Sequence, residues 1–179
     1  MNILLHMCCA NCAIFPVKVL REQNQNVTGF FFNPNIHPYQ EFERRLETVE
    51  AYAAKVELEV IYQRDYLLED FLAHVAANPL SRCDYCYQSR LAETARTAAE
   101  KGFDAFSTSL LYSRYQQHER IREYGEHLAA LYAIPFVYKD FREGWRQGIE
   151  ASKSMGLYRQ QYCGCIYSEK DRYYPRHRN

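Results

Sequence analysis

Apolar and polar positions follow two periodicities along this chain. Short apolar runs rich in β-branched and aromatic residues predict buried strands, and longer stretches with apolar residues three or four positions apart predict helices. The predicted strands cover 3–7, 27–32, 58–62, 103–110 and 134–138. The predicted helices cover 16–23, 40–56, 67–77, 86–101, 116–132 and 142–155.

This alternation of strands and helices is typical of an α/β protein. Consecutive βαβ units give a mostly parallel sheet with right-handed crossovers. In such sheets, ligands bind outside the carboxyl ends of the strands, where the strand order reverses. No linker or internal repeat interrupts the pattern, so we predict a single α/β domain over residues 1–179.

Composition excludes some classes of protein. The formal net charge is zero, so the whole molecule does not attract nucleic acid or acidic membranes by charge alone. The first residues lack the basic and apolar regions of a signal peptide, and no apolar stretch reaches membrane-spanning length. We therefore expect a cytoplasmic protein without a membrane partner, in which cysteines stay reduced.

The seven cysteines fall into three tight groups. Clustered cysteines indicate a metal, a cluster or a redox pair rather than core packing. The first group directly follows the first predicted strand, at the edge of the sheet where ligands bind. The three groups are Cys8-Cys9-Ala-Asn-Cys12, Cys83-Asp-Tyr-Cys86 and Cys163-Gly-Cys165.

The first two groups together contain a candidate set of metal ligands, namely Cys8, Cys9, Cys83 and Cys86. Four thiolates hold an iron–sulfur cluster, whereas the usual zinc pairs are separated by two to four residues. The adjacent Cys8 and Cys9 therefore favour a cluster, although the spacing leaves zinc and free thiols open. Cys12 is either an alternative ligand, a ligand of a second metal or a buried thiol.

The third group has a different chemistry. A disulfide between Cys163 and Cys165 closes a very small ring, which Gly164 makes feasible. Such a bond is strained and easily reduced, as in a redox-active pair. Two reduced thiols, or two metal ligands, are the alternative interpretation.

Polar residues elsewhere give weaker signals. His6 fits a core histidine with a satisfied partner. Ser107 and Ser109 end the fourth strand, where they either face Cys8 or cap the strand. From Gly144 onward, seven Lys and Arg residues oppose three acidic residues, leaving about +4, and tyrosines are interleaved. This composition suits phosphate contact and base stacking, but a solvated basic tail is the simpler interpretation of these residues alone.

Several motifs together resemble the QueH family of epoxyqueuosine reductases, over essentially the whole chain. They are Leu4-Leu-His-Met-Cys8-Cys9-Ala, Cys83-Asp-Tyr-Cys86-Tyr with Arg90-Leu91, Ser107-Thr-Ser-Leu-Leu, Ser113-Arg-Tyr-Gln116, Asp140-Phe-Arg-Glu-Gly144-Trp145 and Gly156-Leu-Tyr-Arg-Gln-Gln-Tyr-Cys-Gly-Cys165. Arg114 departs from the family, because proline is common there.

The resemblance implies a Rossmann-like fold of the adenine-nucleotide α-hydrolase (HUP) group. It implies reduction of epoxyqueuosine to queuosine at the wobble position of tRNA, the last step of queuosine biosynthesis, without cobalamin. It also implies an unidentified electron donor. A second iron ion is associated with the family.

The resemblance further implies roles for individual residues. It places a [4Fe–4S] cluster on Cys8, Cys9, Cys83 and Cys86, and a redox-active disulfide between Cys163 and Cys165. Asp84 or a tyrosine is a candidate proton donor. The basic segment at about 156–179, with its tyrosines, is a candidate holder of the anticodon loop.

Three alternatives compete with this interpretation. An ATP-using enzyme of the related PP-loop type needs a glycine-rich phosphate loop after the first strand, where this chain has Cys-Cys-Ala-Asn-Cys. A zinc-stapled RNA-binding module without redox catalysis leaves Cys163-Gly-Cys165 unused. A general thiol–disulfide oxidoreductase needs a Cys-x-x-Cys motif at a suitable helix start, beside an active-site strand.

Overall fold

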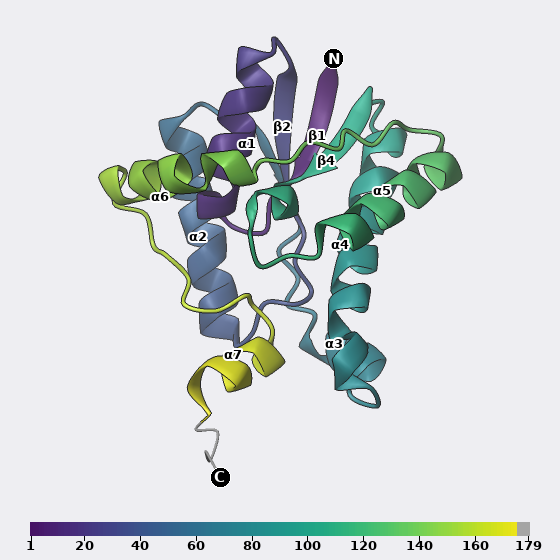
Figure 1. Ribbon diagram of the computed structural model, residues 1–179, viewed down its shortest axis with the longest axis vertical. Coiled ribbons are helices and arrows are strands. Elements are labelled where there is room, and N and C mark those ends of the chain that lie inside the picture. The colour runs from purple at the N-terminus through teal and green to yellow at the C-terminus, as the bar shows by residue number, and fades with distance from the viewer. Residues whose placement is uncertain (175–179) are drawn as a thin grey trace.

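The computed structural model describes residues 1–174 (Figure 1), which contain a four-stranded sheet flanked by helices. All strand pairs are parallel, and the order across the sheet is β3-β2-β1-β4. The strands are β1 (Asn2–His6), β2 (Asn26–Phe31), β3 (Val60–Tyr62) and β4 (Ala105–Thr108). This architecture confirms the predicted Rossmann-like α/β class.

Helices cover both faces of the sheet. On one face α1 packs against β2, α2 and α6, and on the other α4 packs against β1, β4 and α5 (Figure 1). Right-handed crossovers place α1 and α2 opposite α4, because the chain moves across the sheet in opposite directions before and after β3. The helices are α1 (Ala10–Glu22), α2 (Tyr39–Lys55), α3 (Leu68–Val75), α4 (Arg82–Glu100), α5 (His118–Tyr132), α6 (Trp145–Ser154) and α7 (Ile166–Tyr173).

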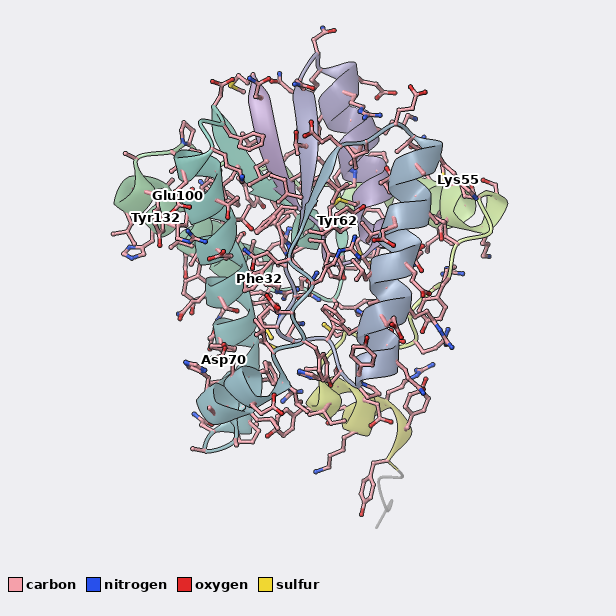
Figure 2. The ribbon with its side chains drawn as sticks, turned by 180° about the vertical axis from the view of Figure 1, so that it is seen from behind. Phe32, Lys55, Tyr62, Asp70, Glu100 and Tyr132 are labelled. Atoms are coloured by element: carbon pink, nitrogen blue, oxygen red, sulfur yellow. The ribbon has the colours of Figure 1, made fainter. Side chains whose placement is uncertain are left out.

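The helices beside the sheet run against the strand direction. Figure 2 shows Lys55 and Glu100, at the ends of α2 and α4, toward one end of the molecule and Asp70 of α3 at the opposite end. The carboxyl ends of the strands and the starts of these helices therefore share the end that also carries α3 and α7. Among residues 1–174, no helix combines the length and apolarity that crossing a membrane requires.

The core is centred on β1, whose neighbours on both sides are strands. Ile3, Leu4 and Leu5 are fully buried, as expected for a central strand of a parallel sheet. Gly29 of β2 leaves room for the Met7 side chain, since a Cβ atom there would collide with the Met7 sulfur. The segment after β1 therefore lies close against β2, which fixes the backbone that leads to the first cysteines.

The predicted fifth strand over 134–138 is wrong. This segment pairs with β4 through a single bridge between Phe106 and Phe136. Beyond this bridge the Val137 carbonyl accepts from the Ser107 hydroxyl at 2.8 Å, and β4 ends at the next residue. A short 3₁₀ turn, Ser109–Tyr112, follows β4 in place of further strand.

Two helix starts also differ from the predictions, and one helix was not predicted. The first helix begins at Ala10 rather than 16, so Pro16 lies inside it. Helix α4 begins at Arg82 and so includes both Cys83 and Cys86. The basic tail contains an unpredicted helix, α7. Arg176 and Arg178, which contributed to the predicted positive charge of this tail, lie outside the described residues.

Candidate functional site

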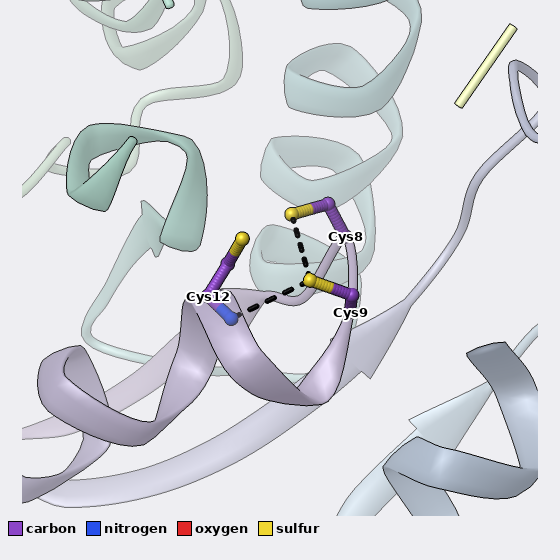
Figure 3. Close-up of side chains that lie close together, drawn as sticks. All are labelled: Cys8, Cys9 and Cys12. Atoms are coloured by element: carbon purple, nitrogen blue, oxygen red, sulfur yellow. Dashed lines mark hydrogen bonds between the residues drawn. The ribbon is translucent and has the colours of Figure 1, made fainter. Parts of the chain in front are cut away.

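Three cysteine sulfurs meet at the carboxyl end of β1. Cys8 follows the strand, Cys9 is the residue that caps α1, and Cys12 lies in the first turn of that helix. Their sulfur atoms all lie within 4.8 Å of one another, and those of Cys8 and Cys9 are 3.9 Å apart (Figure 3). The Cys9 sulfur accepts a hydrogen bond from the Cys12 N–H at 3.4 Å. We call these three residues the sulfur trio.

The sheet topology explains this position. The chain leaves β1 toward β2 on one side and reaches β4 on the other, so the strand order reverses at β1. Ligands of parallel sheets bind at this point. The end of β4 contributes Ser109, whose hydroxyl accepts from the Cys8 N–H at 3.2 Å and lies 3.5 Å from the Cys8 sulfur. Ser109 therefore faces Cys8, as one of the two sequence interpretations expected.

The trio favours a single negative charge on Cys8. Hydrogen bonds from the Cys12 and Cys9 thiols hold the pKa of Cys8 well below its usual range. Burial raises the pKa of Cys9, and the hydrogen bond to Cys8 raises that of Cys12. One thiolate stabilised by two thiols is a good starting point for a soft metal, which displaces protons from cysteine ligands.

His6 is a structural neighbour of the trio. Its Nδ1 lies 3.0 Å from the Thr108 hydroxyl and its Nε2 lies 3.1 Å from the Phe32 carbonyl. The ring is fully buried, and burial lowers its pKa to about 4. These contacts confirm the prediction of a satisfied core histidine.

A segment from the C-terminal part of the chain covers the trio. The Gln160 amide nitrogen lies 2.9 Å from the Cys9 sulfur and 3.7 Å from the Cys12 sulfur. Asn11 fixes this segment, because its side-chain nitrogen donates to the Tyr158 carbonyl at 2.9 Å and to the Gln160 side chain at 2.7 Å. Ser152 of α6 in turn donates to the Asn11 amide oxygen at 2.5 Å.

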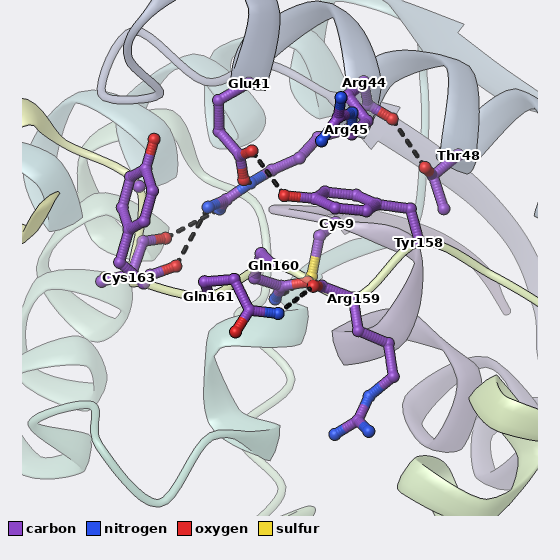
Figure 4. Close-up of polar contacts among 12 residues, drawn as sticks. Cys9, Glu41, Arg44, Arg45, Thr48, Tyr158, Arg159, Gln160, Gln161 and Cys163 are labelled. Atoms are coloured by element: carbon purple, nitrogen blue, oxygen red, sulfur yellow. Dashed lines mark hydrogen bonds and ion pairs between the residues drawn. The ribbon is translucent and has the colours of Figure 1, made fainter. Parts of the chain in front are cut away.

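A buried ion pair in α2 holds the same segment farther along. The Arg45 side chain is 2 % exposed and donates to the Glu41 carboxylate at 2.7 Å (Figure 4). Its two terminal nitrogens donate to the carbonyls of Cys163 at 2.8 Å and Tyr162 at 3.0 Å. Although burial by itself lowers the pKa of Arg45, the paired Glu41 carboxylate raises it, so the guanidinium stays charged.

The third cysteine group lies at the end of this segment. Cys163 is exposed and its sulfur lies 3.5 Å from the Gln116 amide nitrogen, whereas Cys165 is buried and caps α7. Gly164 fits tightly between them, because a Cβ atom there would lie 3.2 Å from the Asn35 carbonyl. Both cysteines are free thiols in this structure.

The second group, Cys83 and Cys86, stands beside the third group. Cys86 and Cys165 share a small buried cluster with Phe71 and Val75. Burial raises the pKa of both Cys83 and Cys86, and the neighbouring Cys163 and Cys165 raise it further. Within the described part of the chain, the sulfur trio is the one group of three or more metal-ligating side chains in close contact. The structure thus brings together Cys8, Cys9 and Cys12, and it does not place Cys83 or Cys86 in that group.

A cleft of about 750 Å³ connects the trio with Cys163. Cys8 and Cys12 line it together with Cys163, so two of the three cysteine groups face one space. Tyr115 and Trp145 also line the cleft, so part of its wall is aromatic. A molecule in this cleft can therefore contact both groups of sulfur atoms at once.

Other predicted site residues are engaged in contacts within the protein, although Tyr162 also lines the cleft. Tyr158 donates to the Glu41 carboxylate at 2.6 Å and Tyr162 to the His37 carbonyl at 2.6 Å, so both hydroxyls serve internal contacts. The Asp84 carboxylate is ion-paired with Arg120 and accepts from the Tyr124 hydroxyl at 3.3 Å. Asp84 is not among the residues that line the cleft.

The sequence analysis missed Asn11, Glu41, Arg45 and Gln160. A usable signal existed for two of them. Glu41 and Arg45 occur four residues apart and adjoin Phe42 and Leu46 on the apolar face of their helix. Charged residues on a buried face must be paired, and this spacing allows pairing within the helix.

Fold and site together define a Rossmann-like α/β protein with a cysteine cluster at its topological switch point. The family model described as epoxyqueuosine reductase QueH matches residues 3–171. The chain belongs to this family.

Similar proteins bear the same name. The epoxyqueuosine reductase QueH of Dehalococcoides mccartyi is 39 % identical over 172 residues, which cover 96 % of this chain and 94 % of that protein. The QueH of Thermotoga maritima is 33 % identical, with 96 % and 92 % covered. That of Streptococcus pyogenes serotype M1 is 30 % identical, with 94 % and 71 % covered.

Proposed function

We propose that this protein is an epoxyqueuosine reductase, an oxidoreductase that reduces epoxyqueuosine at the wobble position of tRNA to queuosine. The observation that carries the proposal is the sulfur trio at the switch point of a chain whose family match spans residues 3–171. The cleft supports it, because Cys8, Cys12 and Cys163 face a space large enough for a modified nucleobase.

The sulfur ligands fit an iron–sulfur cofactor. Thiolates are the ligands of such clusters, and Ser109 and Gln160 point hydrogen-bond donors at the Cys8 and Cys9 sulfurs. Such donors tune the potential of a bound cluster. From the family resemblance we propose a [4Fe–4S] cluster on Cys8, Cys9, Cys83 and Cys86, which would supply electrons one at a time. Cys12 is the competing ligand, since it is the residue that contacts Cys8 and Cys9.

The third cysteine group supplies the matching chemistry. Removing the epoxide oxygen as water consumes two electrons and two protons, and oxidation of two thiols to a disulfide releases the same number. We propose that Cys163 and Cys165 act as this pair. Cys163 faces the cleft while Cys165 lies just behind it, buried at the start of α7. An external electron donor must then reduce the disulfide for the next turnover.

One panel of variants, made and kept anaerobic, tests the function and the ligand set together. Iron, sulfide and turnover of epoxyqueuosine-containing tRNA are measured for wild type, Cys12→Ala, the double variant Cys83→Ala/Cys86→Ala, and Cys163→Ser. We expect about four irons and about four sulfides in wild type, retention in Cys12→Ala and loss in the double variant. Cys163→Ser should keep the iron but lose turnover.

Other results of the same panel contradict specific parts of the proposal. Loss of iron in Cys12→Ala with retention in the double variant would make the trio itself the ligand set. One tightly bound zinc without sulfide, and no turnover, would favour the zinc-stapled RNA-binding module. Full multiple turnover by Cys163→Ser would exclude the thiol pair as the electron source.

A further inference from the structure

An exposed aromatic edge borders the cleft. Tyr115 is 84 % exposed, which is unusual for a large ring at the rim of a cavity. It stands edge-on to the half-buried Trp145, with ring centroids 5.9 Å apart at 78°. Both rings line the same cleft as Cys8 and Cys12.

The Trp145 ring of this aromatic edge is held rigidly. The buried Tyr112 ring stacks on Trp145 at 5.2 Å and its hydroxyl donates to the Trp145 carbonyl at 2.9 Å. Gly148 makes this possible, because a Cβ atom there would collide with the Tyr112 hydroxyl. Because folding already fixes the Trp145 ring, a ligand that stacks on it causes little further loss of side-chain entropy.

One arginine lies beside the aromatic edge, and two more line the same cleft. The Arg114 guanidinium lies 5.8 Å from the Trp145 ring centroid, and exposed Arg159 and Arg172 line the cleft. Within residues 1–174, no carboxylate lies within ion-pair distance of these three arginines. The one acidic residue of the lining, Asp171, is paired with Arg82 at 2.7 Å.

We propose that Tyr115 and Trp145 form a stacking site for an unpaired nucleobase of the RNA substrate, and that Arg114 and Arg159 contact its phosphates. Unpaired bases stack on exposed aromatic side chains, and arginines beside them neutralise the backbone. The occupant is a nucleotide next to the one whose base enters the cleft. This inference rests on the proposed function, and it replaces the tail tyrosines Tyr158 and Tyr162 as the stacking residues.

The chain offers a direct probe, because Trp145 is its single tryptophan. An anticodon stem-loop RNA with guanosine at the wobble position is titrated into wild-type protein, and Trp145 fluorescence and the anisotropy of labelled RNA are recorded. Binding should quench Trp145. The same RNA annealed to its full complement should quench it much less, because its bases are paired.

Variants then separate stacking from folding. Tyr115→Ala should weaken binding by about 5- to 100-fold, whereas Tyr115→Phe should stay within about twofold of wild type. Tyr174→Ala, which removes a 61 % exposed tyrosine of the tail, is the matched control and should also stay within about twofold. Arg159→Gln should reduce the salt dependence of binding, by about one unit of the slope of log affinity against log salt.

Wild-type affinity in Tyr115→Ala, or equal quenching by the paired RNA, would overturn the inference. The outcome is separable from that of the proposed function, since binding is read without turnover. Turnover by wild type together with undiminished binding by Tyr115→Ala would refute the stacking site alone. Weakened binding by Tyr115→Ala without any wild-type turnover would refute the reductase alone.

Discussion

The sulfur trio and the segment that carries the third cysteine group are held in different ways. The trio is local, because Cys8, Cys9 and Cys12 occupy one strand end and one helix start, and backbone geometry brings their sulfurs together. The segment from Tyr158 to Cys165 contains no helix or strand of its own. Side chains from α1 and α2, namely Asn11, Glu41 and Arg45, hold it instead.

The cleft therefore has two kinds of wall. We call the part that carries the sulfur trio the fixed wall, and the segment from Tyr158 to Cys165 the adjustable wall. The fixed wall stands on the central strand, whose residues 3–6 are fully buried. The adjustable wall depends on a few hydrogen bonds between residues more than 100 positions apart in the chain. Three predictions test this contrast, and each removes one support of the adjustable wall.

Arg45→Met should have the largest effect. The substitution removes the buried cation that pairs with the Glu41 carboxylate and donates to two carbonyls, and it leaves Glu41 only its bond from Tyr158. Loss of one partner of a buried ion pair costs about 3–5 kcal/mol of unfolding free energy, measured by urea denaturation. Arg122→Met is the matched control, since its pair with Glu126 has the same spacing but is exposed, and it should cost at most about 0.5 kcal/mol. Equal losses of unfolding free energy in the two variants would show that the buried ion pair stabilises the protein no more than the exposed pair does.

Acid should weaken the same wall through His37. Its Nε2 lies 3.1 Å from the Pro34 carbonyl, and its Nδ1 accepts from the Ile166 N–H at 3.3 Å, next to Cys165. Burial lowers the pKa of His37 to about 4 from its usual 6.5, so the folded protein binds the proton less readily than the unfolded chain. Stability is therefore complete above pH 6.5 and falls as the pH drops toward 4.

The size of this effect is at most about 2 kcal/mol between pH 6.5 and pH 5. Urea denaturation of wild type and His37→Gln at pH 7 and pH 5 measures it, and the variant should lose less stability on acidification. His6 is unchanged in both proteins, so its own titration cancels in the comparison. Equal losses of stability on acidification in wild type and His37→Gln would show that protonation of His37 is not the cause.

Asn11→Ala should have the smallest effect on global stability, about 1–2 kcal/mol, because it leaves the Tyr158 carbonyl and the Gln160 amide oxygen without their donor. Its local effect should be clearer, with faster amide hydrogen exchange across residues 158–163. Asn26→Ala, which removes an exposed hydrogen bond to Asn2, is the control. It should change the free energy of unfolding by no more than about 0.5 kcal/mol and leave amide hydrogen exchange across residues 158–163 unchanged. Unchanged exchange in Asn11→Ala would contradict the role given to Asn11.

Much of the fold and part of the site could be predicted from the sequence. The strands 3–7 and 27–32 and the helix 40–56 have strong periodic patterns, and the structure has elements in all three places. The position of Cys8 at the edge of the sheet followed from the same pattern. The fifth strand was wrong, since the segment 134–138 pairs with β4 through a single bridge in place of a ladder.

The closure of the site could not be predicted in this way. Gln160 contacts Cys9, and Arg45 contacts Cys163, across separations that no local pattern encodes. The sequence pattern predicts a helix that starts at Pro16, whereas in the structure Cys9 caps the helix earlier. Because α1 begins at Ala10, Cys12 lies in its first turn. That turn brings the Cys12 sulfur beside those of Cys8 and Cys9.

The position of Gln160 over Cys9 has a kinetic consequence. Cys9 is 2 % exposed, so a thiol reagent reaches its sulfur only when the covering segment lifts. Lifting breaks a few hydrogen bonds and leaves the central strand intact, so it costs much less than unfolding of the whole protein. The rate at which Cys9 reacts with a thiol reagent therefore reports the opening of this one segment. It is independent of the rate at which the whole protein unfolds.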